Sequence, residues 1–206
     1  MALPDKMTIH LPDLAGTYTA KPIIFRDSVT YGPDANRAKL NQGTSGVDYV
    51  VVQIDIVGLV EAAARASAKV DLGVNRAQRY SAMASLRFAV APTNGNVVEF
   101  FWAASASSVA AEGNPGPLTG VDQDVPGYTG GTHTNDDIVR QMDYIGSFVV
   151  VNTTDVQVAF VGMFIPPTRY GMLVILNRSG QTIAADATDD EDVGIRLEPM
   201  IDEVIE

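Results

Sequence analysis

The residues that could carry acid–base or nucleophilic chemistry are few, because the chain has two histidines, His10 and His133, and no cysteine. A serine triad would need His133, an orienting acid such as Asp136 or Asp137, and an exposed serine. No G-x-S-x-G turn, Walker loop, G-x-G-x-x-G turn or H-E-x-x-H motif is present. The lack of cysteine also excludes disulfides, zinc–thiolate sites and thiol nucleophiles. We therefore expect no catalytic set, and we interpret His133 as a loop histidine that hydrogen-bonds to backbone.

Oxygen ligands for a hard cation such as Ca²⁺ are more plentiful, and the richest acid clusters are Asp122–Asp124 and Asp186–Gly194. Neither cluster has the D-x-D-x-D-G spacing of an EF-hand loop, so we interpret both as acidic turns. Glu99 lies beside Phe100–Trp102 and is the acid whose pKa burial could raise. The alternative, which we favour, is that Glu99 faces outward between inward-facing aromatic rings. The sequence therefore predicts no metal site and no cofactor.

The charge of the chain limits its partners. Its 25 Asp and Glu residues against 14 Lys and Arg residues give a net charge of −11. A phosphate backbone would be repelled, and no Lys/Arg cluster offers a local exception, so we expect no direct contact with nucleic acid. No apolar run approaches the roughly 18 residues of a membrane span. Residues 1–14 also lack the apolar stretch of a secretory signal. We expect no membrane association, and we expect protein partners.

Apolar residues recur with a period of two from Val47 onward, which is the spacing of β-strands. The strands predicted on this basis cover residues 49–57, 65–72, 80–90, 96–105, 145–151, 156–165, 169–177 and 193–200. Charged residues at a spacing of four allow a helix within 61–69 instead, and we favour the strand. The Asn-Gly turn at 93–96 suits a tight hairpin, and a helix capped by Asn135 is expected over 135–145. Short strands with both faces partly apolar predict an all-β fold, specifically a jelly-roll-like two-sheet sandwich.

Residues 1–46 differ from the rest, because their apolar residues are scattered and prolines interrupt them. We expect an extended N-terminal arm over 1–46, with a short strand at Lys21–Arg26, and a β-sandwich domain over 47–206. The stretch 113–137 is rich in glycine and proline and is expected to be an ordered surface loop that makes contacts. The residues expected to contact partners are Ile23, Ile24, Phe25, Tyr31, Tyr128 and His133.

Several short motifs follow one another in a distinctive order. An RY strand (79–80) is followed by a G-N-V strand ending in F-F-W (95–102), a glycine-rich loop beginning GNPG, an IGSF strand (145–148) and RYGMLVILNRSG (169–180). Over about residues 47–200 this order resembles small structural proteins of tailed bacteriophages.

The resemblance implies a non-enzymatic jelly-roll decoration (cement) or fibre-base component of the virion, present in many copies. For a decoration protein the partners would be the major capsid protein or other virion proteins, on the capsid exterior after assembly in the host cytoplasm. A homo-oligomer, and specifically a trimer, is expected because capsid lattices offer three-fold sites. An acidic surface suits the outside of a DNA-filled shell.

Two other functions stay open. A glycan-binding module of a phage tail or fibre would use loop residues such as Tyr128 and His133. Trp102 lies in an apolar strand and is expected in the core, which argues against an aromatic sugar platform. A cupin-like metal enzyme would need several histidines together on barrel strands, and neither histidine lies on a core strand.

Overall fold

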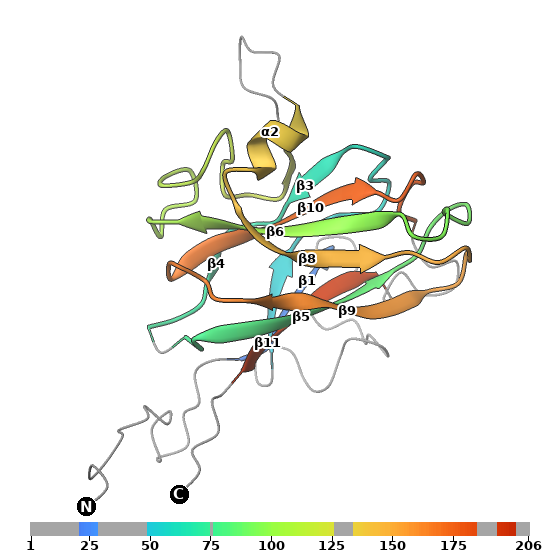
Figure 1. Cartoon of the computed structure of the whole chain (residues 1–206). Coiled ribbons are helices and arrows are strands. Elements are labelled where there is room, and N and C mark those ends of the chain that lie inside the picture. The colour runs from blue at the N-terminus through green and yellow to red at the C-terminus, as the bar shows by residue number, and fades with distance from the viewer. Residues whose placement is uncertain (1–20, 29–48, 75, 126–133, 185–192, 201–206) are drawn as a thin grey trace, which may run out of the picture.

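The computed structural model describes residues 21–28, 49–74, 76–125, 134–184 and 193–200, and its regular elements are strands with one short helix (Figure 1). The strands are β1 (Ile23–Arg26), β2 (Val50–Gln53), β3 (Ala64–Ala66), β4 (Val70–Asp71), β5 (Arg79–Leu86), β6 (Val97–Ser105), β7 (Gln123–Asp124), β8 (Asp143–Val149), β9 (Gln157–Phe164), β10 (Tyr170–Arg178) and β11 (Gly194–Met200). One short helix, α2 (Asn135–Val139), completes the described elements. The predicted all-β class is confirmed.

The strands form one curled sheet in the order β2-β1-β11-β5-β9-β8-β6-β10-β3-β7, with β4 paired to β10 beside this path. Neighbouring strands run antiparallel except for β1 and β2, so the sheet is mixed. The sheet bends round on itself, with β10 and β6 at one side and β5 and β11 at the other (Figure 1). What the sequence suggested as two sheets is therefore one continuous sheet among the described strands.

A large apolar core fills the concave side of the sheet and takes side chains from nearly every strand. Trp102 of β6 lies in it, fully buried, with its ring centroid 5.2 Å from that of Phe164. Gly171 of β10 makes room for this indole, because a Cβ built there would lie 2.4 Å from Trp102 Cε2 and Cζ2. A second, smaller core lies on the convex side of β6 and β10, where Ile138 and Val139 of α2 cover it. Both faces of β6 and β10 are thus buried.

The strand expected at residues 21–26 is confirmed as β1, but it is not part of a free arm. It lies within the sheet between β11 and β2, with Ile23 opposite Leu197 and opposite Val50. The domain boundary expected at residue 46 therefore does not hold for β1. The other residues of the expected arm, 1–20 and 29–46, lie outside the described residues.

The turn at 93–96 is tight, with the Asn96 amide donating to the Thr93 carbonyl over 3.2 Å and Gly95 at a φ of 88°. The hairpin expected around it does not form, because β9 and β8 lie between β5 and β6 in the sheet. The sides of β5 are occupied by β11 and β9, which leaves no position for β6. The local turn was predicted correctly and the strand pairing was not.

Two predicted elements are shorter than expected. The helix ends at Val139, is capped by Thr134 rather than Asn135, and gives way to β8, which contains Ile145. The strand expected over 65–72 is interrupted between β3 and β4. There the buried Ser67 hydroxyl accepts the Leu173 amide over 3.0 Å, taking the place of a backbone ladder bond.

A close approach of two glycines joins β8 to β9. Gly146 and Gly162 are opposite each other, and a Cβ on either would lie 2.1–2.2 Å from a carbonyl oxygen of the facing strand. Irregular register lies next to this point in both the β6–β8 and the β5–β9 pairs. Such bulges increase local bending, so the sheet curves at this crossing.

Candidate interaction surface

The structure describes three of the six residues predicted to contact partners. Ile23, Ile24 and Phe25 are buried in the chain's own fold, at 3%, 0% and 0% exposure. The prediction that these three contact partners was wrong, because both faces of β1 are buried within the chain's own fold. Tyr31, Tyr128 and His133 lie outside the described residues.

The acid cluster at 122–124 joins the two ends of the sheet. Asp122 accepts hydrogen bonds from the Gln53 side chain, the Asp55 amide and Arg65 Nε, over 3.1, 3.0 and 2.6 Å. Arg65 also binds Asp124 over 2.9 Å. Because β2 and β7 are the ends of the strand order, this group closes the curl of the sheet. The Arg65 guanidinium lies between the two carboxylates, where a bound cation would need to lie. We call Gln53, Arg65, Asp122 and Asp124 the clasp, because their contacts connect the two ends of the sheet.

Asp55 lies beside this clasp, and its pKa is raised above the ordinary value. Burial raises its pKa, and the nearby carboxylates of Asp27 and Asp122 add to the effect. The Val57 amide, which donates to the Asp55 carboxylate over 3.1 Å, and Arg65 work in the opposite direction. A pocket of about 290 Å³ lies beside the clasp and is lined partly by Asp55 and Arg65. Its lining residues also include Asp124 and contain no serine, threonine, lysine or histidine.

Glu99 is the other acid singled out by the sequence, and it forms an ion pair. Arg178 Nε lies 2.8 Å from a Glu99 carboxylate oxygen, and the same guanidinium also binds Asp136 of α2. Glu99 is on the convex side of β6, opposite the face that carries Phe100 and Trp102 into the core. The outward-facing interpretation is therefore confirmed. The arrangement anchors α2 to the sheet.

The glycine-rich stretch is partly integrated into the fold. Leu118 and Val125 are buried in the second core, so the described part of this stretch is not a free contact loop. Lys69 holds the segment before it, donating from Nζ to the carbonyls of Ser107, Val109 and Glu112 over 3.1, 2.6 and 2.8 Å.

The most unusual exposed feature is an apolar surface on the convex side of β5, β9 and β8, which we call the outer apolar face. Its side chains are large, and each is between 39% and 66% exposed. They are Met83, Tyr144, Val149, Val158, Phe160, Met163 and Ile165. Met83 lies directly opposite Phe160 in the ladder, so the residues form one surface across neighbouring strands. Contiguous exposed apolar surface of this kind is typical of interaction sites.

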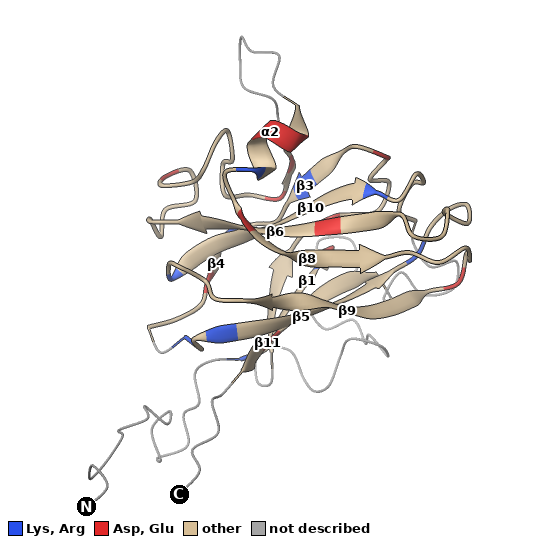
Figure 2. Cartoon of the chain, in the orientation of Figure 1, with Lys and Arg blue, Asp and Glu red and all other residues tan. Residues whose placement is uncertain are grey.

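Ion pairs border the outer apolar face on both sides. On β11, Arg196 binds Glu198 over 2.6 Å, and on β6 and β10 Glu99 binds Arg178. Between these pairs, the outward-facing polar positions of β5, β9 and β8 are serines, except Arg79 at the start of β5, and β9 is free of charge in Figure 2. The middle of the surface is therefore uncharged although the chain is strongly acidic.

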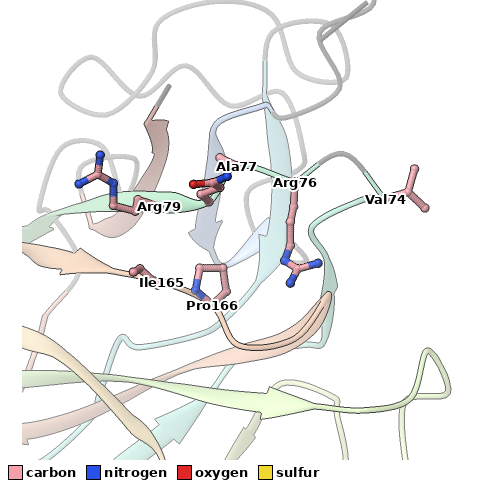
Figure 3. Close-up of a pocket in the computed structure, with 7 residues that line it drawn as sticks. Val74, Arg76, Ala77, Arg79, Ile165 and Pro166 are labelled. Carbon is pink, nitrogen blue, oxygen red and sulfur yellow. The ribbon is translucent and has the colours of Figure 1, made fainter. Parts of the chain in front are cut away.

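A pocket of about 470 Å³ lies at one end of the outer apolar face. Figure 3 shows Arg79 of β5 and Arg76 beside Ile165 and Pro166, which follow β9. This end of the face thus carries positive charge next to exposed apolar side chains.

Among the described residues no group of three or more His, Asp or Glu side chains could hold a metal ion. No helix of the described chain is long and apolar enough to cross a membrane. Comparison of the chain with protein-family models, curated proteins and solved structures finds no match.

Proposed function

We propose that this protein is a non-enzymatic structural protein of a tailed-bacteriophage virion, and specifically a capsid decoration (cement) protein with a jelly-roll-like domain. The observation that carries the proposal is the outer apolar face, an uncharged surface on the middle strands of the sheet. An assembly protein needs such a surface, because burying apolar area drives association at no cost in charge desolvation.

The positions of the ionisable side chains support a non-catalytic role. Asp122 and Arg65 neutralise each other in the clasp, and Glu99 and Arg178 do so beside α2. An enzyme concentrates perturbed titratable groups in a cleft beside a nucleophile or a metal. Here the Asp122–Arg65 and Glu99–Arg178 pairs connect parts of the fold instead.

The proposed partners are the major capsid protein, other virion proteins and further copies of this chain. The net charge of −11 suits the capsid exterior, because the interior of the shell faces packaged phosphates. Segments beyond the described residues, including most of residues 1–46, are proposed to add contacts by strand addition.

A glycan-binding tail or fibre module is the second hypothesis, and the described residues give it less support. Trp102 is the only tryptophan and is fully buried, so it provides no stacking surface for a sugar ring. Tyr128 and His133, the loop residues suggested for this role, lie outside the described residues. Competable binding on a glycan array would favour this hypothesis over decoration.

The test of the proposed function is quantitative mass spectrometry of purified virions, with heads and tails separated and copy number referred to the major capsid protein. We expect many copies in heads. Few copies confined to tails would favour the receptor-binding hypothesis, and absence from both fractions would refute a virion role.

A further inference from the structure

We propose that the pocket at the start of β5 is a docking site for residues 201–206 of the same chain. These residues read Ile-Asp-Glu-Val-Ile-Glu and lie outside the described residues. The inference goes beyond the proposed function, because it concerns a site at which the chain binds a segment of its own and requires no virion partner.

The pocket combines positive charge with apolar walls. Two arginines line it, and none of its lining residues is an acid. In Figure 3 the Arg76 side chain lies beside Pro166, which belongs to the segment that follows β9. Arg79, Val74 and Ile165 line the same pocket. Electrostatic complementarity therefore selects a ligand that carries carboxylates next to apolar side chains.

The described acids near this pocket already have basic partners. Asp71, which precedes the pocket segment in the sequence, accepts a hydrogen bond from Arg169 Nε over 2.6 Å. Glu198 of β11 binds Arg196 over 2.6 Å. Among the described residues no acid is paired with Arg76. A carboxylate that complements Arg76 therefore has to come from another segment.

The end of β11 leads toward this pocket. Met200, the last residue of β11, is opposite Arg79, the first residue of β5. Each step forward along one antiparallel strand is matched by one step back along its partner, so three further steps in this register would bring Glu203 opposite Arg76. Three extended residues span about 10 Å. The acids of the segment are thus within reach of the pocket.

Residues 201–206 also have the chemistry that the pocket selects, because three of them are acidic, three are apolar and none is basic. In the docked segment Asp202 and Glu203 neutralise the arginines, and Val204 packs toward Ile165. Direct attachment to β11 gives the segment an effective concentration of about the millimolar range, which a separate acidic peptide would have to exceed. The docked segment covers the Ile165 end of the outer apolar face and leaves its middle open to partners.

The experiment is disulfide trapping in the full chain, which has no cysteine of its own. The test chain carries Ile165→Cys and Val204→Cys, and the control chain carries Val60→Cys and Val204→Cys. Val60 is similarly exposed but lies outside the outer apolar face, near the pairing of Ile183 with Phe88 past the other end of β5. In a glutathione redox buffer, the test chain should form a disulfide within one chain about tenfold faster than the control chain.

Charge exchange tests the role of Arg76 in the same assay. In the test chain, Arg76→Glu should slow trapping about fivefold, which is the effect of losing an exposed ion pair. Glu203→Arg should slow it by a similar factor, and the chain with both substitutions should recover the original rate. Emission from the buried Trp102 verifies that each variant is folded.

Thiol titration and non-reducing electrophoresis give the rate and the connectivity of each disulfide. Equal rates in the test and control chains, a rate that Arg76→Glu leaves unchanged, or disulfides that join two chains would each overturn the proposal. The assay uses the purified chain, so it is separate from the virion role. A chain that is trapped as expected but missing from virions would keep the docking site and refute the proposed function. A chain that is abundant in heads but not trapped would refute the docking site alone.

Discussion

Substitution of Gly171 by alanine should be strongly destabilising, although the change adds a single methyl group. The new Cβ would lie 2.4 Å from Cε2 and Cζ2 of Trp102 and 2.6 Å from its Nε1. Carbon atoms pack best at about 3.5–4.0 Å, so the overlap exceeds about 1 Å. The indole cannot retreat easily, because it is fully buried and packs on Phe164. Overpacking costs about 1–3 kcal/mol, and we expect Gly171→Ala to cost about 3 kcal/mol.

The assay uses the single tryptophan of the chain, which is the side chain that the substitution displaces. Denaturant unfolding followed by Trp102 emission should show a lower midpoint, and thermal unfolding should show a decrease in Tm of about 6–12 °C. The control is Trp102→Leu, followed by circular dichroism, because leucine leaves space for the added methyl group. Adding Gly171→Ala to that background should cost about 2 kcal/mol less than in the wild type. Equal costs in the two backgrounds would refute the assignment of Gly171 as the space that accommodates the indole.

Three further substitutions test other parts of the fold. Lys69→Met removes three charge-assisted hydrogen bonds to carbonyls of residues 107–112. It should lower the free energy of unfolding in urea by about 2–3 kcal/mol. A decrease below about 0.5 kcal/mol would contradict the role of Lys69 in holding this segment. Asp55→Asn should stabilise the protein at neutral pH: the pKa of Asp55 is raised in the folded state, so its unfavourable contribution appears as pH rises above 3.8. The amide oxygen of the substituted side chain can still accept the Val57 amide, and a Tm that is unchanged at neutral pH or lower than that of the wild type would argue against burial as the dominant effect. Gly162→Ala should lower the Tm by several degrees, because its Cβ would lie 2.2 Å from the Ile145 carbonyl oxygen, and a wild-type Tm would show that β8 and β9 can separate at little cost.

The strand positions were largely predictable because a period of two is a local property of the sequence. β5, with Tyr80, Ala82, Ala84 and Leu86 buried on one side, shows the pattern directly. The order of the strands was not predictable, because it depends on which edges are already occupied. The Asn-Gly turn before β6 indicates a reversal of the chain but carries no information on the strands β8 and β9 that lie between β5 and β6.

The exposure of the outer apolar face was not predicted, for a related reason. In the sequence β9 is apolar at both odd and even positions, which is also the pattern of a strand buried on both faces. β10 has such a pattern and is buried on both faces, whereas Val158, Phe160 and Met163 of β9 are exposed. β9 and β10 differ in what covers their convex side. Side chains of α2 and of residues 118–125 pack on β10 and β6, and none of them packs on β9 in this second core.

Residues 23–25 show the opposite error, because they were predicted to be exposed partner contacts and are buried. The segment lies among scattered prolines and looked like part of an arm, but its strand residues are the link between β2 and β11. Sequence separation hid this pairing, since β1 is the first described strand of the chain and β11 is the last. The contacts of Asp122 in the clasp were not predictable for the same reason, because Gln53 and Arg65 are far from Asp122 in the sequence.

The most direct measurement of the central claim is the copy number of this protein in purified heads for three forms of the chain: wild type, Phe160→Glu and Val60→Glu. The account predicts many copies for the wild type and for Val60→Glu, and a decrease to background for Phe160→Glu. Equal incorporation of Phe160→Glu and wild type would show that the outer apolar face is not the assembly surface, and absence of the wild type from virions would contradict the proposed function itself.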